Sequence, residues 1–319
     1  MASAPRLRVP PPQPPEGPKG RGGRSLSDNP PKAGMTRRPV LLSLDEMPEW
    51  FQREPNKWVL HGHRPISGSA RVSFRSWLYL HSETFNIYSH LIPAVAFLLG
   101  ERFIQRYLAS RYAEVTAADF IAFSIFMVAA VTCLSLSATY HTVMNHSEHM
   151  ENFCLRLDML GVVIFILGDI ILGIYLVFWC ESLPRTIYWV LVGVFGALTV
   201  LATLHPKFQG AKYRLFRALM FVATGLCGVA PVIHGANLFG MAQMMRKAFP
   251  YTMAKAGCLL SGTAFYATRF PESRWPGKFG LWGSHTIFRV LAVCAAVVQL
   301  AGYLDAYRYA RANLTCSPP

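Results

Sequence analysis

The sequence has 319 residues, of which 52% are hydrophobic and only 15% are charged, whereas about a quarter of the residues in soluble proteins are charged. Together with a mean hydropathy of +0.28, this composition excludes an ordinary soluble protein and predicts a multi-pass membrane protein. The net charge of +14 does not indicate nucleic acid as a partner, because the basic residues lie in a terminal tail and in short loops rather than in a groove lined with aromatic side chains.

The N-terminal part of the chain differs from the rest. Residues 1–45 are rich in Pro, Gly and Arg, a composition that predicts a disordered tail. In residues 46–80, which follow, Trp50, Phe51 and Trp58 are mixed with charged residues. This juxtamembrane segment is predicted either to lie at the membrane interface as a short helix and loop or to be an ordinary soluble connection.

A membrane domain is predicted over residues 81–311, followed by a short tail at 312–319. Apolar runs of about 20 residues, the length that crosses a bilayer, recur along this domain. Because lipid offers the backbone no hydrogen bonds, each run is predicted to be a helix, which makes the fold all-α. The seven runs are residues 86–107, 117–143, 154–179, 186–205, 214–235, 248–268 and 285–307.

The distribution of Lys and Arg predicts the orientation of these helices. Thirteen of the 31 Lys and Arg residues lie before residue 80, and cytoplasmic segments are the ones that carry an excess of positive charge. The N-terminus is therefore predicted to be cytosolic. After seven spans, the C-terminus is predicted to be outside.

Four of the predicted spans carry polar or ionisable side chains near one end, and such residues are rare in membrane helices. In the predicted orientation all four ends face the cytosol at a similar depth. Where a span carries more than one of these residues, the spacing places them on one face of the helix. The residues are Glu83, Asn86 and His90 in the first span, Ser137 and His141 in the second, Asp158 in the third, and His285 and Arg289 in the seventh.

Any one of these residues is most simply an interfacial group or a polar contact between helices. Agreement among four helices in depth favours a common site instead. Histidine and aspartate are typical of zinc sites, where the carboxylate either binds the metal or orients a bound water. A catalytic zinc normally has three protein ligands, and the sequence offers two histidines at the expected depth, His141 and His285.

The cysteines and the charged residues deeper in the spans are candidates for sites of other classes. The seven cysteines include no C-x-x-C pair, so neither a disulfide framework nor a thiolate metal site is expected. Asp169 lies deep in the third span, and Lys255 is alone in the sixth. A transport function would depend on Asp169, although a hydrogen bond to a neighbouring helix also accounts for it.

Several motifs occur in order over most of the chain outside the tail. They are HGHRP, ETFNIYSHL, SATYH followed 17 residues later by Asp158, FPESRWPGKF and GSHTIF. In these motifs the chain resembles the progestin and adipoQ receptor family, also called haemolysin-III-related, which includes the adiponectin receptors and fungal zinc-homeostasis membrane proteins. The match runs from about Leu60 to Tyr309, and the residues from PEWFQ to HGHRP and the stretch RSWLYLHSETFNIYSH are similar to those of fungal members. The resemblance implies a seven-helix fold, a cytosolic N-terminus and a zinc ion near the cytoplasmic face.

The resemblance also implies roles for individual residues. His141 matches a zinc-binding histidine at the end of the second span, Asp158 the aspartate that holds a zinc-bound water, and His285 the first histidine of an H-x-x-x-H motif on the seventh span. The second histidine of that motif is expected where this sequence has Arg289. Arginine has no lone pair to give a metal, and its fixed positive charge repels Zn²⁺.

Three explanations of Arg289 are consistent with the sequence. Zinc binds more weakly, with His141, His285 and either Asp158 or water completing its ligands. Alternatively, the site holds no metal, and Arg289 forms a salt bridge with Asp158. The third explanation is a single base change that converted a histidine codon to an arginine codon in this sequence. Between the first two, the charge argument favours zinc that is weakly bound or absent over an intact site.

The resemblance implies two functions of different classes. The first is a receptor or regulator of lipid and zinc homeostasis, which binds a lipid or an extracellular protein and signals inward. The alternative is a zinc-dependent intramembrane hydrolase of lipid amides, similar to a ceramidase, with Asp158 as the base and Ser137 near the substrate or the developing oxyanion. Arg289 counts against the hydrolase. In either case the protein is expected in the plasma membrane or an endomembrane, with membrane lipids as partners, and the sequence gives no oligomeric state.

Overall fold

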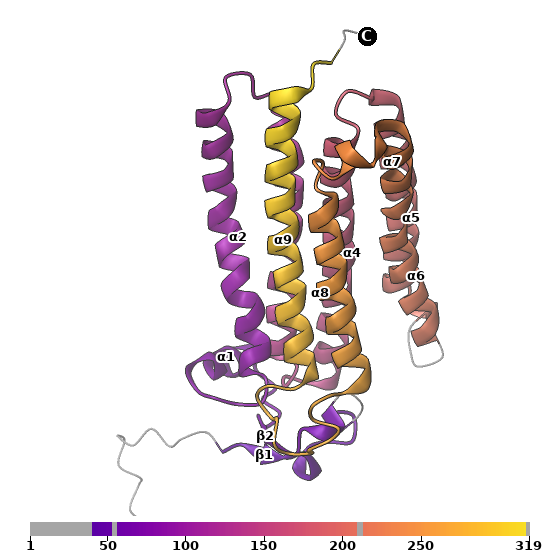
Figure 1. Cartoon of the computed structure of the whole chain (residues 1–319). Helices are drawn as coiled ribbons and strands as arrows, with labels where there is room; N and C mark the ends of the chain where they lie inside the picture. Colours follow the sequence, from indigo (N-terminus) through magenta and orange to yellow (C-terminus); the bar gives the residue numbers. More distant parts are fainter. Residues whose placement is uncertain (1–39, 53–55, 209–212, 317–319) are drawn as a thin grey trace, which may run out of the picture. The chain divides into compact units, whose positions relative to one another are not determined.

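The structure, a computed structural model, describes residues 40–52, 56–208 and 213–316. The predicted tail lies outside the described residues up to residue 39, as do residues 317–319 at the other end. In the described part the long segments are helices that lie side by side (Figure 1).

All seven predicted spans are helical, which confirms the predicted all-α membrane fold. Among the described residues, six helical segments are long and apolar enough to cross a membrane. The helix at the predicted sixth span is not one of the six, and it is less apolar because it contains Lys255 and several Gly, Ser and Thr residues. The long helices are α2 (Thr84–Arg111), α3 (Ala117–Val143), α4 (Glu148–Val177), α5 (Ser182–Leu204), α6 (Arg214–Leu226), α7 (Val229–Met244), α8 (Phe249–Thr268) and α9 (Ser284–Asn313).

The contact between α3 and α4 shows how closely the helices approach one another. A Cβ atom placed on Gly168 of α4 would lie 2.6 Å from the Cβ atom of Ala129 on α3, so a larger residue would push the two helices apart. The principal core is formed by buried side chains of α2, α3, α4 and α9, including Phe97, Phe126 and Leu172. Large apolar side chains on the outer faces are exposed, as expected of helices that contact lipid.

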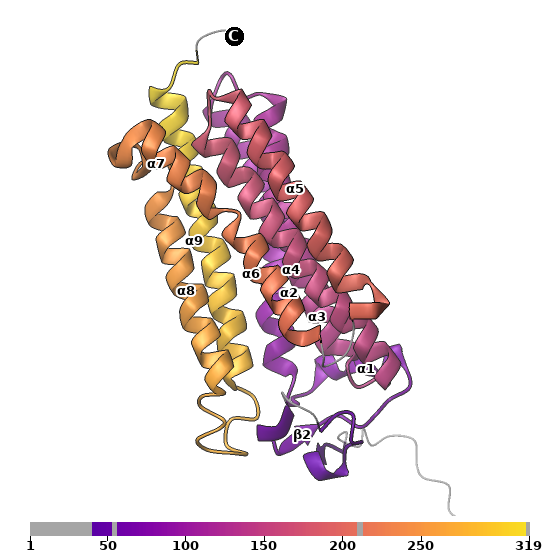
Figure 2. The same ribbon diagram turned by 90° about the vertical axis from the view of Figure 1, so that its right-hand side faces the viewer.

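The predicted fifth span forms two helices instead of one. Helix α6 ends at Leu226, and α7 begins at Val229 after a change of direction (Figure 2). Pro231 accounts for the position of this break, because it has no N–H group to donate to the carbonyl of Cys227 four residues earlier.

The segment before α2 folds against the ends of the helices. Strand β1 (Leu42–Ser43) pairs antiparallel with β2 (His61–His63). Between them, Phe51 is only 4% exposed and packs with buried side chains that include Tyr140 of α3. Phe51, which lies in the segment for which the sequence predicts either an interfacial helix or a soluble connection, therefore belongs to a protein core.

In the described part of the chain, four further short elements precede α2, and one follows α5. They are the 3₁₀ turns η1 (Leu44–Glu46), η2 (Asn56–Trp58), η3 (Ser76–Leu78) and η4 (Pro206–Phe208), and the short helix α1 (Ala70–Arg75). Around Trp50, Phe51 and Trp58, where a short helix is expected, the described residues form turns and η2, and the short helix α1 lies later in the segment, where η3 continues it toward the start of α2. Whether residues 46–80 lie at the membrane surface stays a prediction.

The cysteine pattern led to a wrong expectation, because the structure contains a disulfide between Cys180 and Cys316. The two residues are separated by 136 positions, so their pairing depends on the fold and leaves no signal in local spacing. Cys180 follows α4 and Cys316 follows α9, which places the bond where both helices end. Disulfides persist in oxidising compartments, so the predicted orientation, which places this end outside, can be tested through this bond.

We predict that this disulfide forms in cells and faces outward. In intact cells, a membrane-impermeant reductant followed by an impermeant maleimide should label Cys180 and Cys316, whereas neither should react without the reductant. Mass spectrometry of the digested protein measures the labelling, and Cys316→Ser, which frees Cys180, is the control. For protein at the cell surface, labelling that requires permeabilised cells would show that the predicted orientation is wrong.

Candidate functional site

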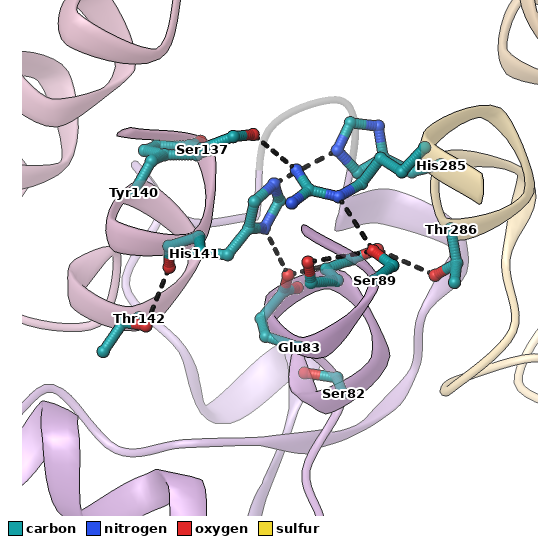
Figure 3. Close-up of polar contacts among 12 residues, drawn as sticks. Ser82, Glu83, Ser89, Ser137, Tyr140, His141, Thr142, His285 and Thr286 are labelled. Atoms are coloured by element: carbon teal, nitrogen blue, oxygen red, sulfur yellow. Dashed lines mark hydrogen bonds and ion pairs between the residues drawn. The ribbon is translucent and has the colours of Figure 1, made fainter. Parts of the chain in front are cut away.

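Polar residues predicted on three different helices meet at one end of the bundle. Helices α2 and α9 begin at this end and α3 finishes there, so that Glu83, His141 and His285 come together (Figure 3). The shared depth that the sequence predicts for these clusters is therefore present in the fold.

A continuous series of polar contacts joins the three helices. Nδ2 of Asn86 donates to Oε2 of Glu83 over 2.8 Å, and the same oxygen lies 2.7 Å from Nδ1 of His141. Nε2 of His141 lies 3.2 Å from Nε2 of His285. Thr286, the next residue on α9, donates from Oγ1 to Oδ1 of Asn86 over 2.7 Å. The N-terminal turns of α2 and α9 are thus connected directly and also through the end of α3.

The contact with Glu83 fixes the tautomer of His141. A carboxylate only accepts hydrogen bonds, so Nδ1 of His141 carries a proton and, in the neutral ring, Nε2 presents its lone pair to His285. A carboxylate behind the imidazole is common where histidine binds a metal. The same arrangement also suits a hydrogen bond donated by Nε2 of His285.

Arg289 lies one turn beyond His285 on α9, and only 2% of it is exposed. Its Nη1 donates to Oγ of Ser137 on α3 over 2.8 Å, and its Nε donates to Oγ of Ser89 on α2 over 3.3 Å. Its Nη2 is buried and has no hydrogen-bond partner in the described part of the chain. A guanidinium group therefore lies between three helices, at the position for which the resemblance implies a third histidine.

Asp158 and His90 are buried close enough to Arg289 to interact with its charge, and neither forms a hydrogen bond with the guanidinium. Asp158 does not form the salt bridge with Arg289 that one of our alternatives required, because the guanidinium bonds to two serines instead. The negative charges of Asp158 and Glu83 still act on Arg289 through space. Both ring nitrogens of His90 are buried, and neither has a partner among the described residues.

These side chains match the requirements of zinc only in part. Two nitrogen ligands at 2.0–2.1 Å from a tetrahedral zinc are separated by about 3.3 Å, close to the 3.2 Å between the Nε2 atoms of His141 and His285. At the position for which the resemblance implies a third ligand, the chain has Arg289, which has no lone pair. No group of three His, Cys, Asp or Glu side chains within the described ranges is arranged to hold a metal ion. The residues present therefore do not form a three-ligand zinc site.

Sequence reasoning missed the side chain that holds the end of α3. Arg64 is buried, and it donates from Nη2 to the carbonyl of His141 over 2.7 Å and from Nη1 to the carbonyl of Thr142 over 2.8 Å. The last carbonyls of a helix lack partners within the helix, and a positive charge there is favourable. Burial lowers the pKa of Arg64 to about 10, so its guanidinium stays charged at neutral pH. The only signal in the sequence was the place of Arg64 in the HGHRP motif.

Glu272 plays the corresponding part at the start of α9. Its Oε2 accepts a hydrogen bond from the backbone N–H of Ser284 over 2.7 Å, and its Oε1 accepts one from the hydroxyl of Ser284. The first N–H groups of a helix also lack partners, and a negative charge near them is favourable. Because Ser284 precedes His285, Glu272 fixes the first turn of the helix that carries His285 and Arg289. Glu272 lies in the FPESRWPGKF motif, which gave no hint of this contact.

Asp169 lies outside this site and has partners of its own. Its Oδ2 lies 2.6 Å from Nζ of Lys255 on α8, and its Oδ1 accepts a hydrogen bond from the hydroxyl of Tyr303 on α9 over 3.0 Å. Lys255 therefore has an ionic partner on α4. The two residues can meet because α4 and α8 both pack on α9. The ion pair compensates both charges and ties three helices together, so Asp169 has a structural explanation and the transport hypothesis loses its support.

Known proteins resemble this chain along most of its length. A family model described as "Haemolysin-III related" matches residues 78–300. The adiponectin receptor protein of Drosophila melanogaster is 34% identical over 276 residues, which are 86% of this chain and 61% of that protein. The ADIPOR-like receptor IZH2 of Saccharomyces cerevisiae is 32% identical over 293 residues, which are 91% of this chain and 92% of that protein. The heptahelical transmembrane protein ADIPOR1 of Oryza sativa subsp. japonica is 30% identical, with 88% and 87% of the two chains covered. The chain thus spans less than two thirds of the length of the Drosophila protein.

We predict that Arg64→Gln destabilises the protein by about 3 kcal/mol, because a lost hydrogen bond from a charged donor costs about 1.5–3 kcal/mol and two carbonyls of α3 lose such a donor. Unfolding of the purified protein in neutral detergent, followed by tryptophan fluorescence, measures the effect. Arg102→Gln, an exposed change on α2, is the control and should leave the transition unchanged. An unchanged transition in Arg64→Gln would contradict the role of Arg64 at the end of α3.

Proposed function

Because the chain belongs to the haemolysin-III-related family, we propose that it is a seven-helix membrane receptor or regulator of lipid and zinc homeostasis. The names of its relatives include adiponectin receptor and ADIPOR-like receptor. On this proposal the chain binds a lipid or an extracellular protein. Binding then changes the arrangement of the helices, and this change reaches the polar site formed by the ends of α2, α3 and α9.

The observation that carries the choice of a receptor over an enzyme is the position of Arg289. A hydrolase with a catalytic zinc needs three protein ligands and an open fourth position for water. Here a buried guanidinium replaces one ligand, and in a medium of low dielectric its charge opposes a dication. The receptor function does not depend on a metal and therefore survives this replacement.

Arg289 also gives the site a property that a receptor needs. It connects α9 to α3 through Ser137 and to α2 through Ser89. Any movement of α9 relative to its neighbours must break or rearrange these hydrogen bonds, and lipid supplies no substitute for them. A ligand that binds one arrangement of the helices better than another can shift the equilibrium between them.

The ceramidase-like alternative conflicts with the contacts around Arg289. It assigns Ser137 to the substrate or the oxyanion, but the Ser137 hydroxyl accepts a hydrogen bond from Arg289. It also requires the zinc that the residues present do not fit. We therefore derive no hydrolytic step for this chain.

We predict that the purified protein contains well under one zinc ion per chain and that Arg289→His raises the content to about one. Histidine supplies a third nitrogen ligand and removes the opposing charge. Elemental mass spectrometry measures the zinc. Arg289→Gln, which removes the charge without adding a ligand, separates the two causes and should stay low. About one zinc per chain in the unchanged protein would overturn the metal-free site. Zinc in none of the variants would contradict the interpretation of His141, His285 and position 289 as places for zinc ligands.

We also predict that the purified protein does not hydrolyse lipid amides, although its expression changes the zinc and lipid content of cells. Fluorescent ceramide is the probe for hydrolysis, measured as released fatty acid. Cell zinc and lipids are measured by mass spectrometry in yeast that lacks IZH2, with an empty vector as the control. Ceramide hydrolysis that a chelator abolishes would favour the enzyme, and unchanged zinc and lipid content would argue against the regulator.

A further inference from the structure

The segment between Ala70 and Leu80, which comprises α1, η3 and the two residues that follow, exposes large apolar side chains. Val72 is 47% exposed, Phe74 43%, Leu78 88% and Leu80 64%. Burial of such side chains is normally favourable, and adjacent exposed ones usually mark a surface that contacts something else. This segment ends shortly before Thr84, where α2 begins, so it lies where the chain approaches the bilayer.

The opposite face of the same segment is bound firmly to the protein. Ser73 is fully buried and donates from Oγ to Oδ1 of Asn145 over 2.9 Å. Ser76 is also buried, and its hydroxyl accepts a hydrogen bond from Arg64 over 2.7 Å. Nε1 of Trp77 donates to Oγ1 of Thr142 over 3.0 Å. The orientation of the segment is therefore fixed, and its apolar side chains cannot turn inward.

Two arginines stand on the exposed face of α1. Arg71 and Arg75 are exposed and four residues apart, so they point the same way from the helix. Neither forms a hydrogen bond or an ion pair with another described residue. Phe74 and Val72 lie on either side of this pair around the helix. The surface thus presents uncompensated positive charge flanked by apolar groups.

We propose that this face binds anionic phospholipids of the adjacent leaflet. The arginines would contact the negatively charged headgroups, and Phe74, Leu78 and Leu80 would enter the region of the acyl chains. Cytoplasmic leaflets carry anionic lipid, and the predicted orientation places this segment on that side. Membrane lipid is favoured over a protein partner because the apolar surface leads directly into a membrane helix and its charge complements that of the lipid.

Lipid binding here would act close to the candidate functional site. Ser76 and Trp77 are joined to the end of α3 through Arg64 and Thr142, and Arg64 also holds the carbonyl of His141. A displacement of α1 on binding a headgroup would therefore also displace the groups that position His141. The proposal nevertheless stands independently of the receptor function, because its test measures lipid binding alone.

The test is a titration of phosphatidylserine into the purified full chain in neutral detergent, with bound lipid counted by native mass spectrometry. The double variant R71Q/R75Q should bind roughly 25-fold more weakly, since each basic residue near an anionic surface contributes about 1 kcal/mol, or roughly fivefold. The double variant R102Q/R106Q removes two exposed arginines from the opposite end of α2, and it should bind as the unchanged protein does. Equal affinity of the two double variants would overturn the proposal.

A second measurement examines the apolar part in a bilayer. Amide hydrogen exchange of residues 70–80 is compared in nanodiscs of phosphatidylcholine alone and of phosphatidylcholine with phosphatidylserine. Exchange should be slower with phosphatidylserine, faster again in Leu78→Ser, and sensitive to salt, which screens charges. Glycerophosphoserine, the headgroup without acyl chains, should not compete. Protection that is the same in both lipids, or cross-links from this face to a second copy of the chain, would overturn the proposal.

Discussion

A charged group buried among membrane helices must find its hydrogen-bond partners in the protein, because lipid supplies none. Arg289 is a buried charged residue to which this requirement applies. Its donors reach serines on α2 and α3, which requires the ends of three helices to lie within a side chain's length of one another. The contacts among Glu83, His141 and His285 are possible only because the helices meet in this way. The candidate site is therefore a consequence of how the bundle closes at this end.

The charges around Arg289 form a balanced set. Glu83 attracts both Arg64 and Arg289, and Asp158 also acts on Arg289. Two positive and two negative side chains thus act on one another at this end of the bundle. The opposite charges attract one another through space, although the four side chains form no direct ion pair with one another.

Much of the fold could be predicted from the sequence, because the length and apolarity of membrane helices are strongly constrained. The boundaries of α3 and α8 agree with the predicted spans within one residue. The division of the fifth span was less accessible, since the effect of Pro231 depends on whether neighbouring helices compensate for it. The shared face of His285 and Arg289 followed from helix geometry. The parts of Arg64 and Glu272 could not be predicted, because they contact backbone groups far away in sequence, and side chain to backbone contacts leave no pairing signal between residue types. Lys255 and Asp169 lie 86 residues apart, and Cys180 and Cys316 lie 136 apart, so these two pairings depend on the fold and could not be predicted from local spacing.

The bond between Cys180 and Cys316 closes everything from the end of α4 to the end of α9 into one covalent ring. A single proteolytic cut within this ring would leave both pieces attached to each other. Pulling on the C-terminal end would load the end of α4 directly and would not unwind α9 turn by turn. The helix that carries His285 and Arg289 is thus anchored mechanically at its far end, so that a force arriving there reaches the polar site as a shift of the whole helix.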